Sequence, residues 1–116
     1  MSKVKEAVLA IFFTLFALST FAQTGSVRGR IIDAKTKKPL EFVNVSIRAT
    51  GTQTPLTGTV SDSTGVFRIN RVKNGTYTLT ASFIGYKSVE KEFTISPTAR
   101  NVNVKNILLE EDSQVI

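Results

Sequence analysis

The feature that most constrains the fold is a long alternating stretch, residues 74–86. It opens with Asn-Gly, a pair that favours tight turns because both residues tolerate positive φ. Apolar residues then occupy every second position: Tyr77, Leu79, Ala81 and Phe83. Period-two alternation with aromatic and β-branched residues is typical of a half-buried strand. We therefore predict that this stretch forms the central strand of a small β-sandwich.

The first part of the chain, residues 1–22, has the pattern of a secretory signal peptide. Two lysines give a positive start, residues 7–18 form an apolar core, and the small residue Ala22 precedes Gln23 at the expected cleavage site. A spanning helix needs about 20 apolar residues, so a signal peptide is favoured over a membrane anchor. We expect this segment to form a helix outside the fold, with export of the chain that begins at Gln23.

Six further segments show strand patterns separated by turn signals: residues 27–32, 42–48, 58–61, 66–69, 89–95 and 102–109. The turn residues Asp62 and Gly65 lie between two of these segments, for which we predict a hairpin. No helical periodicity follows residue 22. The pattern predicts an all-β, seven-stranded antiparallel Greek-key β-sandwich over residues 23–109, followed by an acidic tail of residues 110–116.

The alternation also identifies the side chains that should form the core. They are Val27, Ile31, Val43, Val45, Ile47, Phe67, Ile69, Tyr77, Leu79, Phe83, Phe93 and Val104. A domain this small, without cysteine, is held together by its apolar core alone, so we expect modest stability.

Composition excludes several classes of function. The chain has no Cys and no His, which removes disulfides, thiolate metal sites and the usual general base. Its formal net charge of +6 would suit an anionic partner, but the Lys and Arg residues are scattered along the sequence. They lack the interleaved aromatic residues of RNA-binding proteins. We expect these cations on the solvated outer faces of strands, and no nucleic-acid partner.

Five sequence elements, in a fixed order, resemble the carboxypeptidase-regulatory-like domain family. They are Val27-x-Gly29-x-Ile31, Pro39-Leu40-x-x-Val43-x-Val45, Ser61-Asp62-x-x-Gly65-x-Phe67, Gly75-x-Tyr77-x-Leu79 and Ile84-Gly85-Tyr86. The resemblance covers about residues 25–109 and implies a transthyretin-like sandwich. In exported bacterial proteins, such a domain is similar to the N-terminal extension of TonB-dependent outer-membrane receptors, including starch-utilisation-type transporters.

The resemblance implies a non-catalytic accessory domain on the periplasmic side of the outer membrane, acting in protein–protein contact or signalling. Its partner would be a receptor plug and barrel or the TonB-side machinery, and it implies no cofactor. The chain has no series of alternating barrel strands, so we interpret it as the N-terminal part of a longer receptor. The alternative is a free-standing exported module that binds carbohydrate or protein at the cell surface. An accessory domain of an exported peptidase is a third hypothesis, which would require a catalytic domain.

Several polar residues are candidates for functional sites. Asp33, Glu41 and Asp62 fall in separate loops that lack the dense acidic pattern of a calcium site, so turn and capping roles are favoured. The segment Asp62-Ser63-Thr64 resembles a bacterial O-glycosylation sequon, which makes Ser63 a candidate for modification beside the plain alternative of an Asx turn.

The motif residues also have structural interpretations. Pro39 enters a strand, Gly65 serves a tight turn, and Gly85 marks a bulge next to Tyr86. Tyr86 is the better candidate for stacking on a sugar ring, because Tyr77 falls on the inferred core face. The motifs therefore specify a fold rather than a chemical site.

Overall fold

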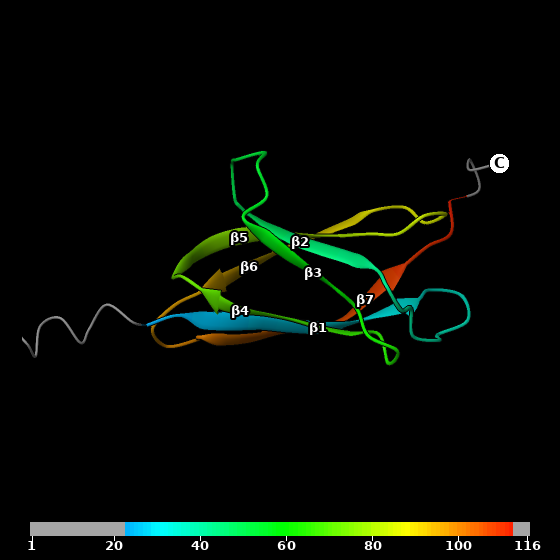
Figure 1. Cartoon of the computed structure of the whole chain (residues 1–116), viewed down its shortest axis with the longest axis horizontal. Coiled ribbons are helices and arrows are strands. Elements are labelled where there is room, and N and C mark those ends of the chain that lie inside the picture. Colours follow the sequence, from blue (N-terminus) through cyan, green and yellow to red (C-terminus); the bar gives the residue numbers. More distant parts are fainter. Residues whose placement is uncertain (1–22, 113–116) are drawn as a thin grey trace, which may run out of the picture.

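The computed structural model describes residues 23–112; the predicted signal-peptide helix and Ala22 lie outside these residues. Seven strands form two sheets that pack face to face (Figure 1). The strands are β1 (Gly25–Asp33), β2 (Asn44–Ala49), β3 (Thr57–Val60), β4 (Val66–Val72), β5 (Gly75–Ser82), β6 (Val89–Ile95) and β7 (Asn101–Leu109). The predicted all-β sandwich of seven strands is confirmed.

The two sheets have three and four strands, in the orders β4-β1-β7 and β3-β2-β5-β6. β5 pairs antiparallel with β2 on one side and with β6 on the other. The alternating stretch that dominates the sequence is therefore an inner strand of its sheet, as predicted. It ends at Ser82, so residues 83–88 form a loop rather than a continuation of the strand.

The prediction of an entirely antiparallel sandwich was wrong for one pair. β1 and β7 run parallel, from Ser26 opposite Asn101 to Asp33 opposite Leu109. A short turn between consecutive strands forces antiparallel pairing. β1 and β7 are the first and last strands, and the chain reaches β7 from the other sheet, so no turn imposes that direction.

The predicted hairpin between residues 58–61 and 66–69 was also wrong. β3 pairs with β2, whereas β4 pairs with β1 in the opposite sheet. Residues 61–65 therefore carry the chain from one layer to the other. The turn residues were recognised correctly, but turn chemistry does not show whether the two strands around it share a sheet.

The second strand begins at Asn44, two residues later than predicted. Phe42 has φ of 65°, in the left-handed region, and its side chain is 66% exposed. Its backbone N–H donates, at 3.0 Å, to the carbonyl oxygen of Ser61, which lies outside the named strands. The apolar character of Phe42 was therefore misread as the start of the strand.

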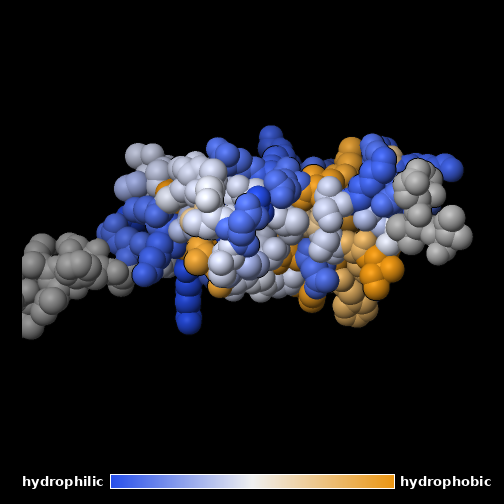
Figure 2. All heavy atoms as spheres, turned by 90° about the horizontal axis from the view of Figure 1, so that it is seen from above, coloured by the Kyte–Doolittle hydropathy of each residue, from blue (hydrophilic) through white to orange (hydrophobic). Residues whose placement is uncertain are grey.

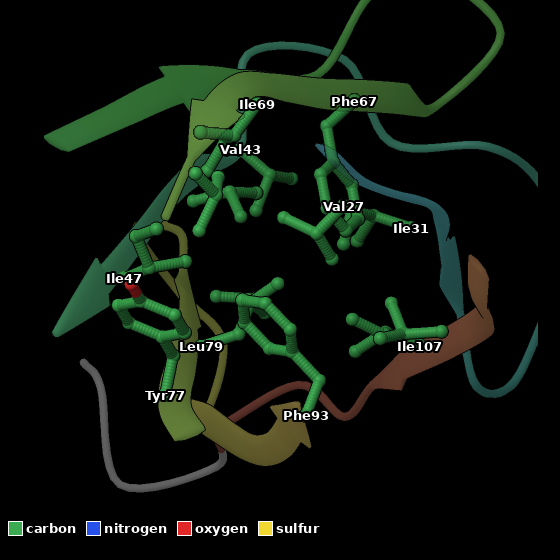
Figure 3. Close-up of a cluster of buried hydrophobic side chains, with 14 of the residues drawn as sticks. Val27, Ile31, Val43, Ile47, Phe67, Ile69, Tyr77, Leu79, Phe93 and Ile107 are labelled. Atoms are coloured by element: carbon green, nitrogen blue, oxygen red, sulfur yellow. The ribbon is translucent and has the colours of Figure 1, made fainter. Parts of the chain in front are cut away.

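The core lies between the two sheets, where side chains from both layers point towards each other (Figure 3). Every predicted core residue is buried except Phe83, which is partly buried and packs against the cluster. The buried hydrophobic residues that were not predicted are Ile32, Val72, Ala81, Ile95, Ile107 and Leu109.

A register shift in β7 explains two of these omissions. Lys105 has φ of 63°, and the pairing of β7 with β1 shifts between Arg28 and Arg30. A bulge of this kind moves the residues beyond it to the opposite face. Val104 therefore faces inward, and so do Ile107 and Leu109, which simple alternation places on the outside.

Candidate functional site

Three of the five sequence motifs meet at one end of the sandwich, which we call the motif end. It comprises the end of β1 with residues 34–43, the turn at residues 61–65, and the loop at residues 83–88 (Figure 1). The N–H of Ile31 donates to the carbonyl of Gly65 at 2.7 Å, which joins β1 to the turn. Within the first part, the N–H of Leu40 donates to the carbonyl of Ile31 at 3.0 Å. Pro39 forms an isolated bridge with Ile32.

Ser61 is a buried polar residue at the centre of this end, with 1% of its surface exposed. Its hydroxyl donates to the carbonyl of Leu40 at 2.6 Å and accepts the backbone N–H of Val43 at 3.0 Å. One small side chain thus satisfies two backbone groups at the bend that leads into β2. Ser61 belongs to one of the sequence motifs, but nothing in the sequence indicates this role.

Asp62 and Gly65 build the turn that changes sheets. One Asp62 carboxylate oxygen accepts three hydrogen bonds: from the N–H of Thr64 at 2.9 Å, from the Thr64 hydroxyl at 2.7 Å, and from the N–H of Val66 at 3.0 Å. These hydrogen bonds, that of the Thr64 hydroxyl foremost, lower the pKa of Asp62 below its usual value. Gly65 has φ of 79°, and a Cβ there would lie 2.4 Å from the carbonyl oxygen of Ile31. Only glycine suits this position.

Asp33 and Tyr86 join the end of β1 to the loop at residues 83–88. The Tyr86 hydroxyl donates to one Asp33 carboxylate oxygen at 2.7 Å, and the other accepts the N–H groups of Lys35 and Thr36 at 2.8 Å each. The hydrogen bond from the Thr36 backbone, followed by that from Tyr86, lowers the pKa of Asp33 to about 2. The same carboxylate, with burial, raises the pKa of Tyr86 to about 12.

The segment after β7 is held on the same loop. The N–H of Lys87 donates to the carbonyl of Glu110, and the N–H of Asp112 donates to the carbonyl of Gly85, each at 2.9 Å. Tyr86 and Glu111 form an isolated antiparallel bridge. The first residues of the predicted acidic tail are thus attached to the sandwich through the Ile-Gly-Tyr motif.

Two apolar side chains are exposed at this end. Phe42 is 66% exposed and Ile84 is 92% exposed, although both adjoin motif residues. In Figure 2, most hydrophobic surface on the visible face lies in the half of the molecule towards this end. Burying such side chains against a partner would be favourable, at roughly 25 cal/mol per Å² of apolar surface.

The two tyrosines considered for sugar stacking both have other contacts. Tyr77 is 7% exposed, lies against Phe93 with ring centroids 5.5 Å apart, and donates its hydroxyl to the carbonyl of Lys73 at 2.7 Å. It cannot present a ring face to a ligand. Tyr86 is half-buried, with its ring centroid 5.8 Å from that of Phe83.

The remaining predicted site residues lie apart from one another. Ser63 is exposed at the tip of the sheet-changing turn, and Gln23 is exposed at the other end of the sandwich, where its side-chain oxygen accepts a hydrogen bond from Arg100. Gly29 is an inner-face residue against which Phe67 packs, since a Cβ there would lie 2.8 Å from that ring. The other motif residues with buried side chains, Val43, Val45 and Leu79, belong to the core.

The polar side chains of the motif end described above, Asp33, Ser61, Asp62 and Tyr86, form hydrogen bonds that stabilise turns and loops. Within residues 23–112, no group of three or more acidic side chains is placed to hold a metal ion; in particular, Asp33, Glu41 and Asp62 do not form one. The same part of the chain contains no helix long and apolar enough to cross a membrane. The geometry fixes backbone segments and presents a small apolar surface, which suits contact with a protein.

Comparison with known proteins supports the sequence resemblance. Residues 27–116 match the family described as CarboxypepD_reg-like domain. No curated protein matches the chain.

Among solved structures, the chain is similar to the pilus 2b backbone protein of group B streptococcus (TM-score 0.63, 17% identity, 79% of this chain and 43% of that chain). It is also similar to the shaft pilin SpaA from Lactobacillus rhamnosus GG (TM-score 0.61, 20% identity, 78% of this chain and 48% of that chain). A third similar structure is BcpA, the major pilin subunit of Bacillus cereus (TM-score 0.62, 17% identity, 78% and 31%). The chain spans less than half of each pilin, and identity this low indicates a shared fold alone.

Proposed function

Because this chain belongs to the CarboxypepD_reg-like domain family, we propose that it is a non-catalytic accessory domain on the periplasmic side of the outer membrane. In this proposal it forms the N-terminal part of a TonB-dependent receptor. Its role is contact with the plug and barrel or with the TonB-side machinery. The receptor's substrate is then determined outside this domain.

The observation that carries the proposal is the attachment of residues 110–112 to the loop at residues 83–88. Backbone hydrogen bonds from Lys87 to Glu110 and from Asp112 to Gly85 fix the direction in which the chain leaves β7. A domain that must keep a defined orientation to a following segment needs such a fixed exit. A flexible linker would let the domain move freely relative to that segment.

The exposed side chains of Phe42 and Ile84 support contact at the same end. These two side chains would be buried by a partner that packs against the end of the sandwich where the chain leaves it. Large exposed apolar side chains that gather beside ordered loops are typical of interaction sites.

The first test is the coding DNA beyond codon 116. A reading frame that continues into a plug and a series of barrel strands is the expected result. A stop codon with no barrel beyond it would overturn the proposal and favour the free-standing exported module, with carbohydrate or protein as ligand.

The second test uses the full-length receptor. Phe42→Ser with Ile84→Ser should reduce substrate uptake while leaving receptor abundance in the outer membrane unchanged. Leu56→Ser is the matched control, because Leu56 is 62% exposed but lies in the loop between β2 and β3, away from the motif end. Equal uptake in all three receptors would contradict a contact role for the motif end.

A further inference from the structure

Cations that are scattered in the sequence gather on the outer face of the three-stranded sheet. This surface, which we call the donor face, comprises Arg28 and Arg30 of β1, Arg68 of β4, and Asn101 and Asn103 of β7. The three arginines and both asparagines are exposed. The donor face adjoins the motif end at Arg30, whose side chain contacts the turn at residues 61–65.

Strand register brings these residues into rows. Arg28 lies opposite Arg68 on one side and opposite Asn103 on the other, so three donor side chains cross the sheet in line. Arg30 is two residues further along β1, about 7 Å away on the same face. The charges therefore form a compact group with regular spacing.

Within the described residues, the two facing arginines, Arg28 and Arg68, have no compensating acid. Among residues 23–112 the single salt bridge is Arg48 with Glu90, in the other sheet. No hydrogen bond or ion pair involves the side chains of Arg28 or Arg68 in this part of the chain. Like charges directly opposite each other destabilise a sheet. This arrangement costs stability unless a ligand supplies negative charge.

Among residues 23–112, internal hydrogen bonds engage the amide oxygens of both asparagines of the donor face and leave most of its N–H donors without a partner. The side-chain oxygen of Asn103 accepts the backbone N–H of Lys105 at 2.8 Å, and that of Asn101 accepts the hydroxyl of Ser26 at 2.9 Å. Their NH₂ groups remain available, as do the terminal nitrogens of Arg30, whose Nε donates to the carbonyl of Thr64 at 2.9 Å. An oxyanion needs donors alone, so it matches this set.

The surface is hollowed on both sides of Arg28. One hollow, of about 300 Å³, is lined by Ser26, Arg28, Arg68 and Asn101. The other, of about 420 Å³, includes Arg28, Arg30, Asn103 and Asn106 in its lining. Because Arg28 lines both, one bound chain with several anionic groups would reach both hollows.

We propose that the donor face binds an extended acidic segment of a partner protein. Alternate side chains of an extended peptide are about 7 Å apart, which matches the separation of Arg28 and Arg30 along β1. A neutral sugar offers the arginines no negative charge to pair with, and nucleic-acid bases need aromatic rings to stack on. A lipid surface needs an apolar belt, and Val66 is the one apolar side chain in the lining of these hollows.

This inference rests on the proposed role in protein contact and adds a surface and a partner chemistry to it. The two fail independently. A reading frame that ends without a barrel would remove the receptor but leave peptide binding intact. Loss of peptide binding would leave the receptor assignment standing.

The test is titration of the chain with a labelled ten-residue peptide of alternating Glu and Thr, followed by fluorescence anisotropy. Gln in place of every Glu gives the neutral control peptide. Arg28→Gln with Arg68→Gln should weaken binding at least tenfold. Arg71→Gln with Lys73→Gln removes the same charge from exposed residues outside the donor face, and should change affinity less than twofold.

A second variant separates binding from folding. Arg68→Glu places an acid opposite Arg28, so it should abolish peptide binding without lowering the melting temperature. Unchanged binding in either donor-face variant would overturn the proposal. So would equal, arginine-dependent binding of an oligogalacturonate or a single-stranded DNA of the same charge, because the partner would then belong to another class.

Discussion

Replacing Ser61 with Ala tests whether one hydroxyl holds the motif end together. The hydroxyl donates to the carbonyl of Leu40 at 2.6 Å and accepts the N–H of Val43 at 3.0 Å. Ser61 and Val43 are 1% and 0% exposed, so water cannot readily replace the missing oxygen. The substitution removes one oxygen atom and leaves the methyl-sized remainder in place.

The expected loss follows from these two groups. A buried, unsatisfied N–H costs about 1–3 kcal/mol, and the hydrogen bond to Leu40 contributes about 0.5–1.5 kcal/mol. We therefore expect the free energy of unfolding to fall by about 2–4 kcal/mol, a large part of the roughly 5–15 kcal/mol typical of a domain. The melting temperature should fall by more than about 10 °C.

Urea unfolding followed by circular dichroism measures this loss. Ser63→Ala is the matched control, because Ser63 lies exposed in the turn that follows Ser61. The free energy of unfolding of this variant should stay within about 0.5 kcal/mol of that of the unchanged chain. The slope of the unfolding free energy against urea should be the same for both variants. A Ser61→Ala chain as stable as the Ser63→Ala chain would refute the account of this hydroxyl.

Four further substitutions test the motif end. Gly65→Ala should lower the free energy of unfolding by more than about 2 kcal/mol in the same urea experiment, because the position has φ of 79° and a Cβ would lie 2.4 Å from the Ile31 carbonyl oxygen. An unchanged free energy would contradict this clash. Phe42→Asn should raise the unfolding free energy by up to about 1 kcal/mol, since Asn tolerates the left-handed φ of 65° better; a loss would show that the Phe42 ring stabilises the fold. Because the pKa of Asp33 is lowered from 3.8 to about 2, stability should fall as pH decreases through that range, and Asp33→Asn should flatten this acid limb of the melting temperature. Because the pKa of Tyr86 is raised from 10 to about 12, stability should fall as pH rises through that range, and Tyr86→Phe should flatten the alkaline limb of the melting temperature. If neither substitution changes the pH dependence of the melting temperature, the Asp33–Tyr86 pair is not its source.

Much of the fold was predictable because strands carry a local signal. Side chains alternate between core and solvent, so the period-two pattern around Tyr77 and Leu79 identified both a strand and its buried face. Turn residues such as Asp62 and Gly65 also showed where one strand ends and the next begins. Their conformational preferences act within a few residues, so this signal is local as well.

The features that were missed depend on contacts between distant segments. The direction of β7 beside β1 is determined by packing, and no turn between the two strands encodes it. The bulge at Lys105 was invisible because lysine has no preference for its φ of 63°. Ser61 is likewise an ordinary small polar residue until the fold buries it beside Leu40 and Val43.

The donor face shows the same dependence on register most directly. Arg28 and Arg68 are each an ordinary outward-facing residue of a strand, as the sequence predicted. Their meeting requires the antiparallel pairing of β1 with β4 in one particular register. A shift of β4 by one residue would send Arg68 to the core face and Phe67 to solvent, so the register that buries Phe67 and Ile69 also places the two arginines side by side. The packing of the core thus creates the like-charge contact, and a partner's carboxylates would relieve it.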